Sequence, residues 1–217
     1  MFDWFKANSF ESKNLYGFGY KLNWYMIPNV SHDLTCEKLA HDIYLKNQSL
    51  KSWNQGIDSL FDDDSTLSSQ KIFISPNIDG WIYILTTPNQ YLNILDNIVP
   101  DYYAFGSYRV VGATAFKKVK NHQIIRYFSQ ADGCLFANIG VQDPAERSLH
   151  LPDISEMNED EVMDTIYSES FDNTEIFRFD DEEIVIEICK QWTGINPNDF
   201  ESCPIDYISE NGIFGNL

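Results

Sequence analysis

The chain has 217 residues, of which 43% are hydrophobic and 15% aromatic, and its formal net charge is −18. This apolar content excludes a disordered acidic protein and is sufficient to build the core of one large domain. The sequence contains neither an uninterrupted run of eighteen apolar residues nor a basic leader followed by an apolar stretch, so we expect no membrane span and no secretion signal.

The negative charge is concentrated in the last third of the chain. Residues 143–217 contain 20 Asp or Glu against three Lys or Arg, whereas residues 1–142 contain 13 acids and 12 bases. A concentrated field of one sign steers association without specifying a fold, so it favours a basic partner and disfavours direct binding of nucleic acid. The widely spaced cysteines favour reduced thiols in a cytoplasmic protein; they are Cys36, Cys134, Cys189 and Cys203.

The first seventy residues predict a strand followed by two helices. The strand covers residues 21–27, which are mostly aromatic and apolar and end at a Pro-Asn pair. Thr35 is a good N-cap for a helix over 36–46, where apolar residues recur at helical spacing. A second apolar stripe predicts a helix over 50–61, and the polar segment 62–70 predicts a loop.

The middle of the chain is rich in predicted strands. Residues 71–74 and 81–85 flank a turn that ends in Asp79-Gly80, which favours two adjacent antiparallel strands. A short helix over 89–98 follows, capped by Asn89 and ended by Pro100. An antiparallel sheet with helices on one side is the simplest arrangement. Its further strands cover residues 102–105, 109–119, 122–129 and 134–139.

The acidic third predicts helices with irregular connections. Asn158, with Glu161 three residues later, marks a helix start, and residues 180–192 combine acids in the first turn with a 3.6-residue apolar period and Gly194 at the end. The predicted class is α+β, with an antiparallel sheet in the middle of the chain, helices packed on it and an acidic helical C-terminal third. We expect one domain over 1–217, which divides, if at all, into a near-neutral part (1–142) and an acidic helical part (143–217).

Four segments resemble a widespread, poorly characterised group of bacterial proteins. They are Phe73-Ile74-Ser75-Pro76, Asp79-Gly80-Trp81, the run from Phe105 through Gly106 to Arg109-Val110-Val111, and the late helix that closes on Ile195-Asn196-Pro197. The resemblance covers roughly residues 71–200. It implies a cytoplasmic protein of loci that include polymorphic toxin and immunity genes, and it implies no activity. The density of acids between Asp153 and Glu183 departs from that group.

No catalytic, cofactor or metal signature accompanies the charge. The acidic runs lack the glycine and distal glutamate of a calcium loop, and no His or Cys pair has zinc spacing. The sequence contains no Gly-x-Ser-x-Gly elbow, and Cys36 lies on a predicted amphipathic helix, which favours a packed thiol. Gly17-Phe18-Gly19 lacks the third glycine of a dinucleotide site and indicates a turn. We therefore expect no cofactor, no metal and no enzyme.

The leading hypothesis is a cytoplasmic immunity protein that neutralises a cognate basic toxin, such as a nuclease, by occluding its active surface. Its expected electrostatic contacts are Asp160, Glu161, Asp164, Asp172, Glu175, Asp180 and Asp181. One alternative is an enzyme of unrecognised chemistry that binds a small ligand in an aromatic pocket. That pocket would be formed by Trp81, Tyr83, Tyr102, Tyr103, Phe105 and Tyr108. Another alternative is a homo-oligomeric structural protein.

Overall fold

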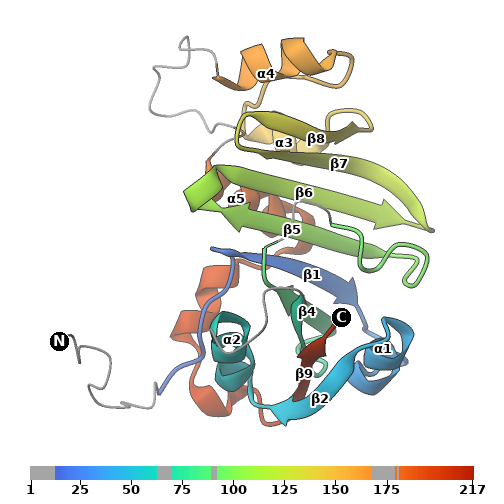
Figure 1. Cartoon of the computed structure of the whole chain (residues 1–217), viewed down its shortest axis with the longest axis vertical. Coiled ribbons are helices and arrows are strands. Elements are labelled where there is room, and N and C mark those ends of the chain that lie inside the picture. The colour runs from blue at the N-terminus through green and yellow to red at the C-terminus, as the bar shows by residue number, and fades with distance from the viewer. Residues whose placement is uncertain (1–12, 63–69, 89–91, 168–178, 180) are drawn as a thin grey trace, which may run out of the picture.

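The computed structural model describes residues 13–62, 70–88, 92–167, 179 and 181–217. They form a nine-stranded sheet in the order β2-β9-β3-β4-β1-β5-β6-β7-β8, and every strand pair is antiparallel (Figure 1). The α+β class and the antiparallel sheet are therefore confirmed. The strands are β1 (Leu22–Pro28), β2 (Lys46–Lys51), β3 (Lys71–Ile74), β4 (Trp81–Thr86), β5 (Tyr102–Tyr108), β6 (Ala113–Lys120), β7 (Gln123–Ala131), β8 (Cys134–Ile139) and β9 (Gly212–Asn216).

Helices cover both faces of this sheet. The helices are α1 (Cys36–Asp42), α2 (Trp53–Phe61), α3 (Pro144–Ser148), α4 (Glu159–Tyr167) and α5 (Glu182–Thr193). The last four share one buried cluster with alternate strand residues such as Trp24 and Phe116, and we call this side the helical face. On the opposite side, the second face, α1 and residues 92–99 cover Tyr25 and Ile84. The expectation of helices on one side is therefore wrong for α1. Within the described residues, no helix has the length and apolar character that a membrane crossing requires.

Short-range signals locate several element ends. The Thr35 side chain accepts the Lys38 N–H at the start of α1, and Asn158 and Glu161 form a reciprocal capping box at the start of α4. Asp181 caps α5, and Gly194 ends it with a left-handed φ of 77°. The two-residue turn Asp132-Gly133 has left-handed φ at both positions and joins β7 to β8, as its sequence predicts.

Other expectations are wrong. Residues 46–51 form strand β2 and do not belong to the helices expected over 36–46 and 50–61. Arg109–Val111 is a 3-10 turn before β6, and residues 94–98 form turns where a helix over 89–98 was expected. Two further 3-10 segments, Pro197–Ser202 and Ile205–Tyr207, connect α5 to β9. The fold places this last strand between β2 and β3.

Candidate functional site

One end of the molecule carries a surface of acidic side chains on and before α4. The helix buries Val162 and Ile166 against the helical face, so its polar residues are turned away from the core. Residues 148–167 contain no Lys or Arg that would neutralise these acids. We call this set, whose members are all exposed, the α4 acidic surface: Glu156, Glu159, Asp160, Glu161 and Asp164.

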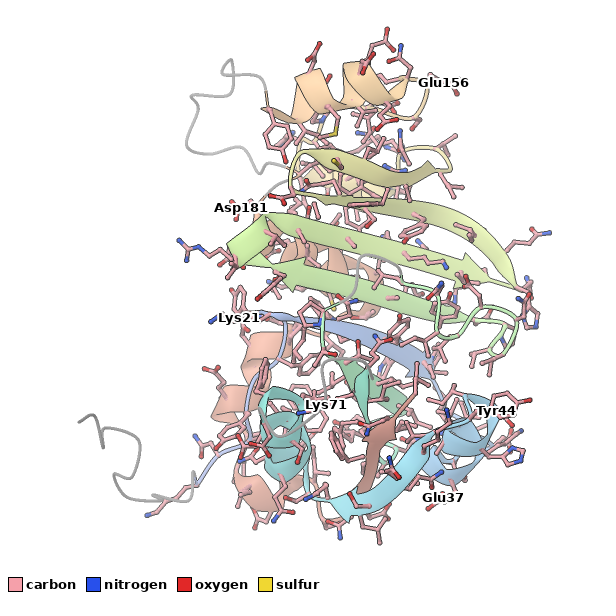
Figure 2. The ribbon with its side chains drawn as sticks, in the orientation of Figure 1. Lys21, Glu37, Tyr44, Lys71, Glu156 and Asp181 are labelled. Atoms are coloured by element: carbon pink, nitrogen blue, oxygen red, sulfur yellow. The ribbon has the colours of Figure 1, made fainter. Side chains whose placement is uncertain are left out.

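The structure brings together three of the seven expected partner contacts. Asp160, Glu161 and Asp164 all lie on α4. Asp181 is the N-cap of α5 and lies well away from Glu156, the labelled residue of the α4 acidic surface (Figure 2). The Asp181 carboxylate accepts the Glu183 N–H at 3.2 Å, so it also caps a helix. The other three contacts lie outside the described residues: Asp172, Glu175 and Asp180.

The acids of this region differ in how free they are to meet a partner. The Glu161 Oε2 accepts the Asn158 N–H at 2.9 Å, so this carboxylate is committed to the start of the helix. Just before the surface, hydrogen bonds from the Ser155 hydroxyl and N–H hold the pKa of Asp153 below its usual value, so the carboxylate is charged at neutral pH. Glu159, Asp160 and Asp164 are the carboxylates best placed for an external cation.

An aromatic ring stands at the C-terminal end of the same helix. Tyr167 is 41% exposed, and its hydroxyl donates to the Gln130 Oε1 at 2.9 Å. Gln130 is itself buried, and its amide donates to the carbonyl of Gly112 and the hydroxyl of Thr114. The ring is therefore held in one orientation before any partner arrives, which lowers the entropic cost of using it as an anchor.

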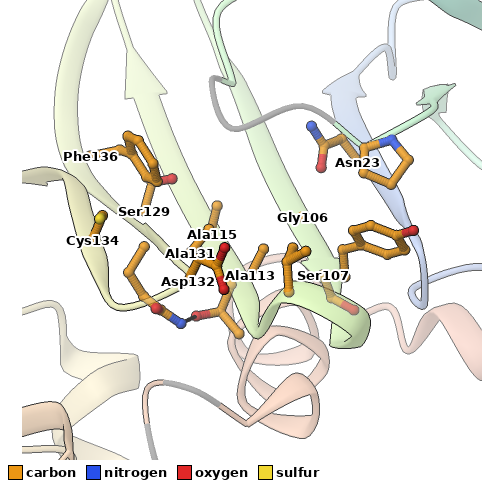
Figure 3. Close-up of a pocket in the computed structure, with 15 residues that line it drawn as sticks. Asn23, Gly106, Ser107, Ala113, Ala115, Ser129, Ala131, Asp132, Cys134 and Phe136 are labelled. Carbon is orange, nitrogen blue, oxygen red and sulfur yellow. Dashed lines mark hydrogen bonds between the residues drawn. The ribbon is translucent and has the colours of Figure 1, made fainter.

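The second face carries a separate feature, a groove across β5, β6, β7 and β8 with a volume of about 450 Å³ (Figure 3). Asn23 lies at one end, and Cys134 and Phe136 lie at the other. We call it the sheet groove. Its floor consists of small residues, and these are Gly106, Ala113, Ala115, Ser129 and Ala131.

Strand alternation produces this floor. The row Phe105, Phe116, Phe128 pairs across three strands on the helical face, and the adjacent row, from Gly106 through Ala115 to Ser129, lies on the second face. The large rings fill the core under α5, so the bulk of these strands is on one side only. Within the described part of the chain, no helix packs over the small row.

The aromatic pocket of the enzyme hypothesis does not have the expected lining. Tyr83, Tyr102 and Phe105 are buried in the two cores, and of the six expected aromatics only Tyr108 lines the sheet groove. The sequence analysis predicted a lining of aromatic residues, whereas small residues make up most of the groove. The available signal was a small residue directly beside a large ring in or at the end of three predicted strands: Gly106 after Phe105, Ala115 before Phe116 and Ser129 after Phe128.

The cysteines divide into buried and accessible thiols. Burial raises the pKa of the Cys36 thiol to about 11 and that of the Cys189 thiol to about 12. Cys134 is exposed at the end of the sheet groove, and Cys203 is half-buried. At pH 8 we expect a thiol reagent to modify Cys134 first and Cys189 only after unfolding. Mass mapping of the labelled peptides measures this order, and early modification of Cys189 would contradict the packing of α5.

Among the described residues, no group of three or more His, Cys, Asp or Glu is placed to hold a metal ion. Comparison with known protein families, curated proteins and solved structures finds no match for this chain. The resemblance to bacterial immunity loci therefore stays a prediction. The α4 acidic surface and the sheet groove are the two features from which a function can be argued.

Proposed function

We propose that this protein is a cytoplasmic inhibitor that binds a basic protein partner through the α4 acidic surface. The observation that carries the proposal is the set of five exposed acids within nine residues, in a segment of twenty residues without Lys or Arg. A cognate toxin with a basic, nucleic-acid-binding cleft fits this surface, because carboxylates can take the place of phosphates in such a cleft.

The helix suits this task by its geometry. Asp160 and Asp164 are four residues apart and so project from the same side of α4, about one turn from each other. Such a row steers a cationic partner toward the helix and sets the rate of encounter. The pre-oriented ring of Tyr167 then supplies buried apolar contact, which holds the complex once it has formed.

Removing the three free carboxylates tests this surface. We expect Glu159→Gln/Asp160→Asn/Asp164→Asn to weaken binding by about 3- to 150-fold at low salt, because each rim charge contributes roughly 0.2–1 kcal/mol. The partner to use is the product of the gene that adjoins the gene for this protein, co-expressed and then titrated by calorimetry at low and high salt. The affinity of the unaltered protein should fall steeply with salt, and that of the variant less steeply.

A matched control separates location from net charge. Asp33→Asn/Asp206→Asn/Glu210→Gln also removes three negative charges, but from exposed positions elsewhere in the fold. We expect it to bind within about twofold of the unaltered protein, since screening limits charges more than about 10 Å away. Equal losses in both triple variants, or an interaction indifferent to salt, would count against the proposal. Far-ultraviolet circular dichroism checks that α4 still folds.

A further inference from the structure

We propose that the sheet groove is a binding site for a planar aromatic molecule that carries a positive charge, such as an aromatic amine. The site is distinct from the α4 acidic surface and does not depend on the inhibitor function. Its floor is Gly106, Ala113, Ala115, Ser129 and Ala131 (Figure 3), and Tyr108, Val111 and Phe136 also line it.

The depth of the groove points to a ligand. Ala115 is 6% exposed and packs in the buried cluster of the second face, and Ser129 beside it on β7 is 2% exposed. The groove beside them has a volume of about 450 Å³, which lies in the range of small-molecule sites, about 300–1,000 Å³.

The shape of the floor favours a flat ring. Ala, Gly and Ser side chains let a planar molecule approach the pleated backbone closely, whereas β-branched side chains would hold it away. A Cβ at Gly106 would come within 2.4 Å of the Asn23 Oδ1, so a larger residue there would displace the buried Asn23 side chain. Half-buried Tyr108 and Phe136 line the groove and can meet the edges of a bound ring.

The charge of the site favours a cation. Among the described residues that line the groove, Asp132 is the only one with a formal charge at neutral pH. Its backbone is fixed, because it begins the tight turn between β7 and β8 and its N–H donates to the Val111 carbonyl at 2.9 Å. A carboxylate at the groove of a chain with a net charge of −18 repels anions such as fatty acids.

Two buried polar side chains also belong to this mainly apolar lining. Asn23 and Ser129 are both more than nine-tenths buried, and both line the groove. A mainly apolar cleft with a few polar groups in its lining is typical of small-molecule sites.

The test uses 9-aminoacridine, a fluorescent planar cation, and an anionic aromatic dye, 1-anilinonaphthalene-8-sulfonate, as its comparator. We expect 9-aminoacridine to bind one-to-one, with a Kd on the order of 10–100 μM, and the anionic dye to bind about tenfold or more weakly. Bound 9-aminoacridine should also slow the labelling of Cys134, which lies in the lining of the groove.

Three variants locate the bound probe. Ala115→Leu fills the floor, and Cys134→Trp blocks one end from an exposed position that does not disturb the core. Each variant should bind 9-aminoacridine about tenfold more weakly than the unaltered protein does. Asparagine suits the left-handed backbone at residue 132, so Asp132→Asn should not disturb the turn. This variant should bind 9-aminoacridine about three- to tenfold more weakly, and it should bind the anionic dye at least as tightly as the unaltered protein does.

The triple variant Asp33→Asn/Asp206→Asn/Glu210→Gln controls for attraction of any cation to the acidic chain, and it should bind 9-aminoacridine as the unaltered protein does. Variants of the α4 acidic surface should likewise leave the Kd of 9-aminoacridine unchanged. Binding of the basic protein partner and binding of 9-aminoacridine therefore test the two proposals separately. The inference is overturned if the groove-filling variants bind 9-aminoacridine normally, if the anionic dye binds equally well, or if an extended apolar peptide alone protects Cys134.

Discussion

Glu146→Gln lowers the free energy of unfolding by about 3–5 kcal/mol, because it leaves the Arg126 guanidinium charged and buried without its ionic partner. Both side chains are 0% exposed in the folded protein. Two parallel hydrogen bonds of 2.8 Å join them, from Arg126 Nε to Glu146 Oε2 and from Nη2 to Oε1. Urea denaturation followed by circular dichroism measures the loss.

Further contacts make the pair a junction. Arg126 on β7 also donates through Nη1 to the Asn138 Oδ1 at 2.8 Å and to the Ile139 carbonyl on the neighbouring strand at 3.2 Å. Glu146 accepts the Asp143 N–H at 2.7 Å and so completes the capping box of α3. Loss of either charge therefore loosens the start of the chain segment that leads to α4 and its acidic surface.

The control is the double replacement Arg126→Met/Glu146→Met. We expect it to recover most of the lost stability, since exchanging a buried ion pair for apolar groups of similar volume is close to neutral or better. Glu210→Gln, at an exposed position, should change the free energy of unfolding by less than about 0.5 kcal/mol. A loss below about 1 kcal/mol for Glu146→Gln would mean that water reaches this pair in solution.

Local chemistry explains the elements that the sequence predicts well. An N-cap such as Thr35 and a turn such as Asp132-Gly133 depend on contacts within three or four residues, so the sequence states them directly. The charge asymmetry likewise predicted acids on α4. The charge asymmetry could not distinguish Glu161, whose carboxylate accepts the Asn158 N–H at the start of that helix, from Asp164, for which no capping hydrogen bond is seen.

Strands β2 and β9 could not be predicted, because their residues become strands only through their neighbours. Exposed β2 has no apolar alternation, and β9 contains two glycines, which usually argue against a strand interior. Both glycines are required by close backbone approach. A Cβ at Gly212 would lie 2.2 Å from the Ile74 carbonyl oxygen, and one at Gly215 would lie 2.5 Å from the Lys46 carbonyl oxygen.

The sheet groove and the α4 acidic surface likewise depend on tertiary packing as well as on local sequence. A row such as Gly106, Ala115 and Ser129 carries no chemistry that a sequence pattern singles out, and it becomes a groove only when three strands align in register. The acids of α4 form a surface because the apolar residues Val162 and Ile166 turn the helix one way against the core. Composition predicted the charge, and tertiary packing determined where it lies.

Phe18→Ala is the second substitution for which we expect a large effect, a loss of about 3–5 kcal/mol in the free energy of unfolding. The ring is 3% exposed and joins segments far apart in the sequence. Its centroid lies 6.1 Å from that of Trp24 on β1, 5.6 Å from Trp53 on α2, 5.5 Å from Tyr83 on β4 and 5.1 Å from Phe200 in the C-terminal 3-10 segment. All four pairs meet edge to face, a favourable arrangement that alanine cannot replace.

The sequence Gly17-Phe18-Gly19 indicates only a turn, yet the residue between the glycines is central to the core of the helical face. Phe18→Leu, which retains most of the volume, should cost less than about 1.5 kcal/mol. Phe61→Ala, at a ring that is 51% exposed, should cost less than about 1 kcal/mol. Urea denaturation monitored by tryptophan emission is a sensitive readout, because Trp24 and Trp53 both contact the deleted ring. Equal losses for Phe18→Ala and Phe61→Ala would show that the N-terminal segment does not close this core in solution.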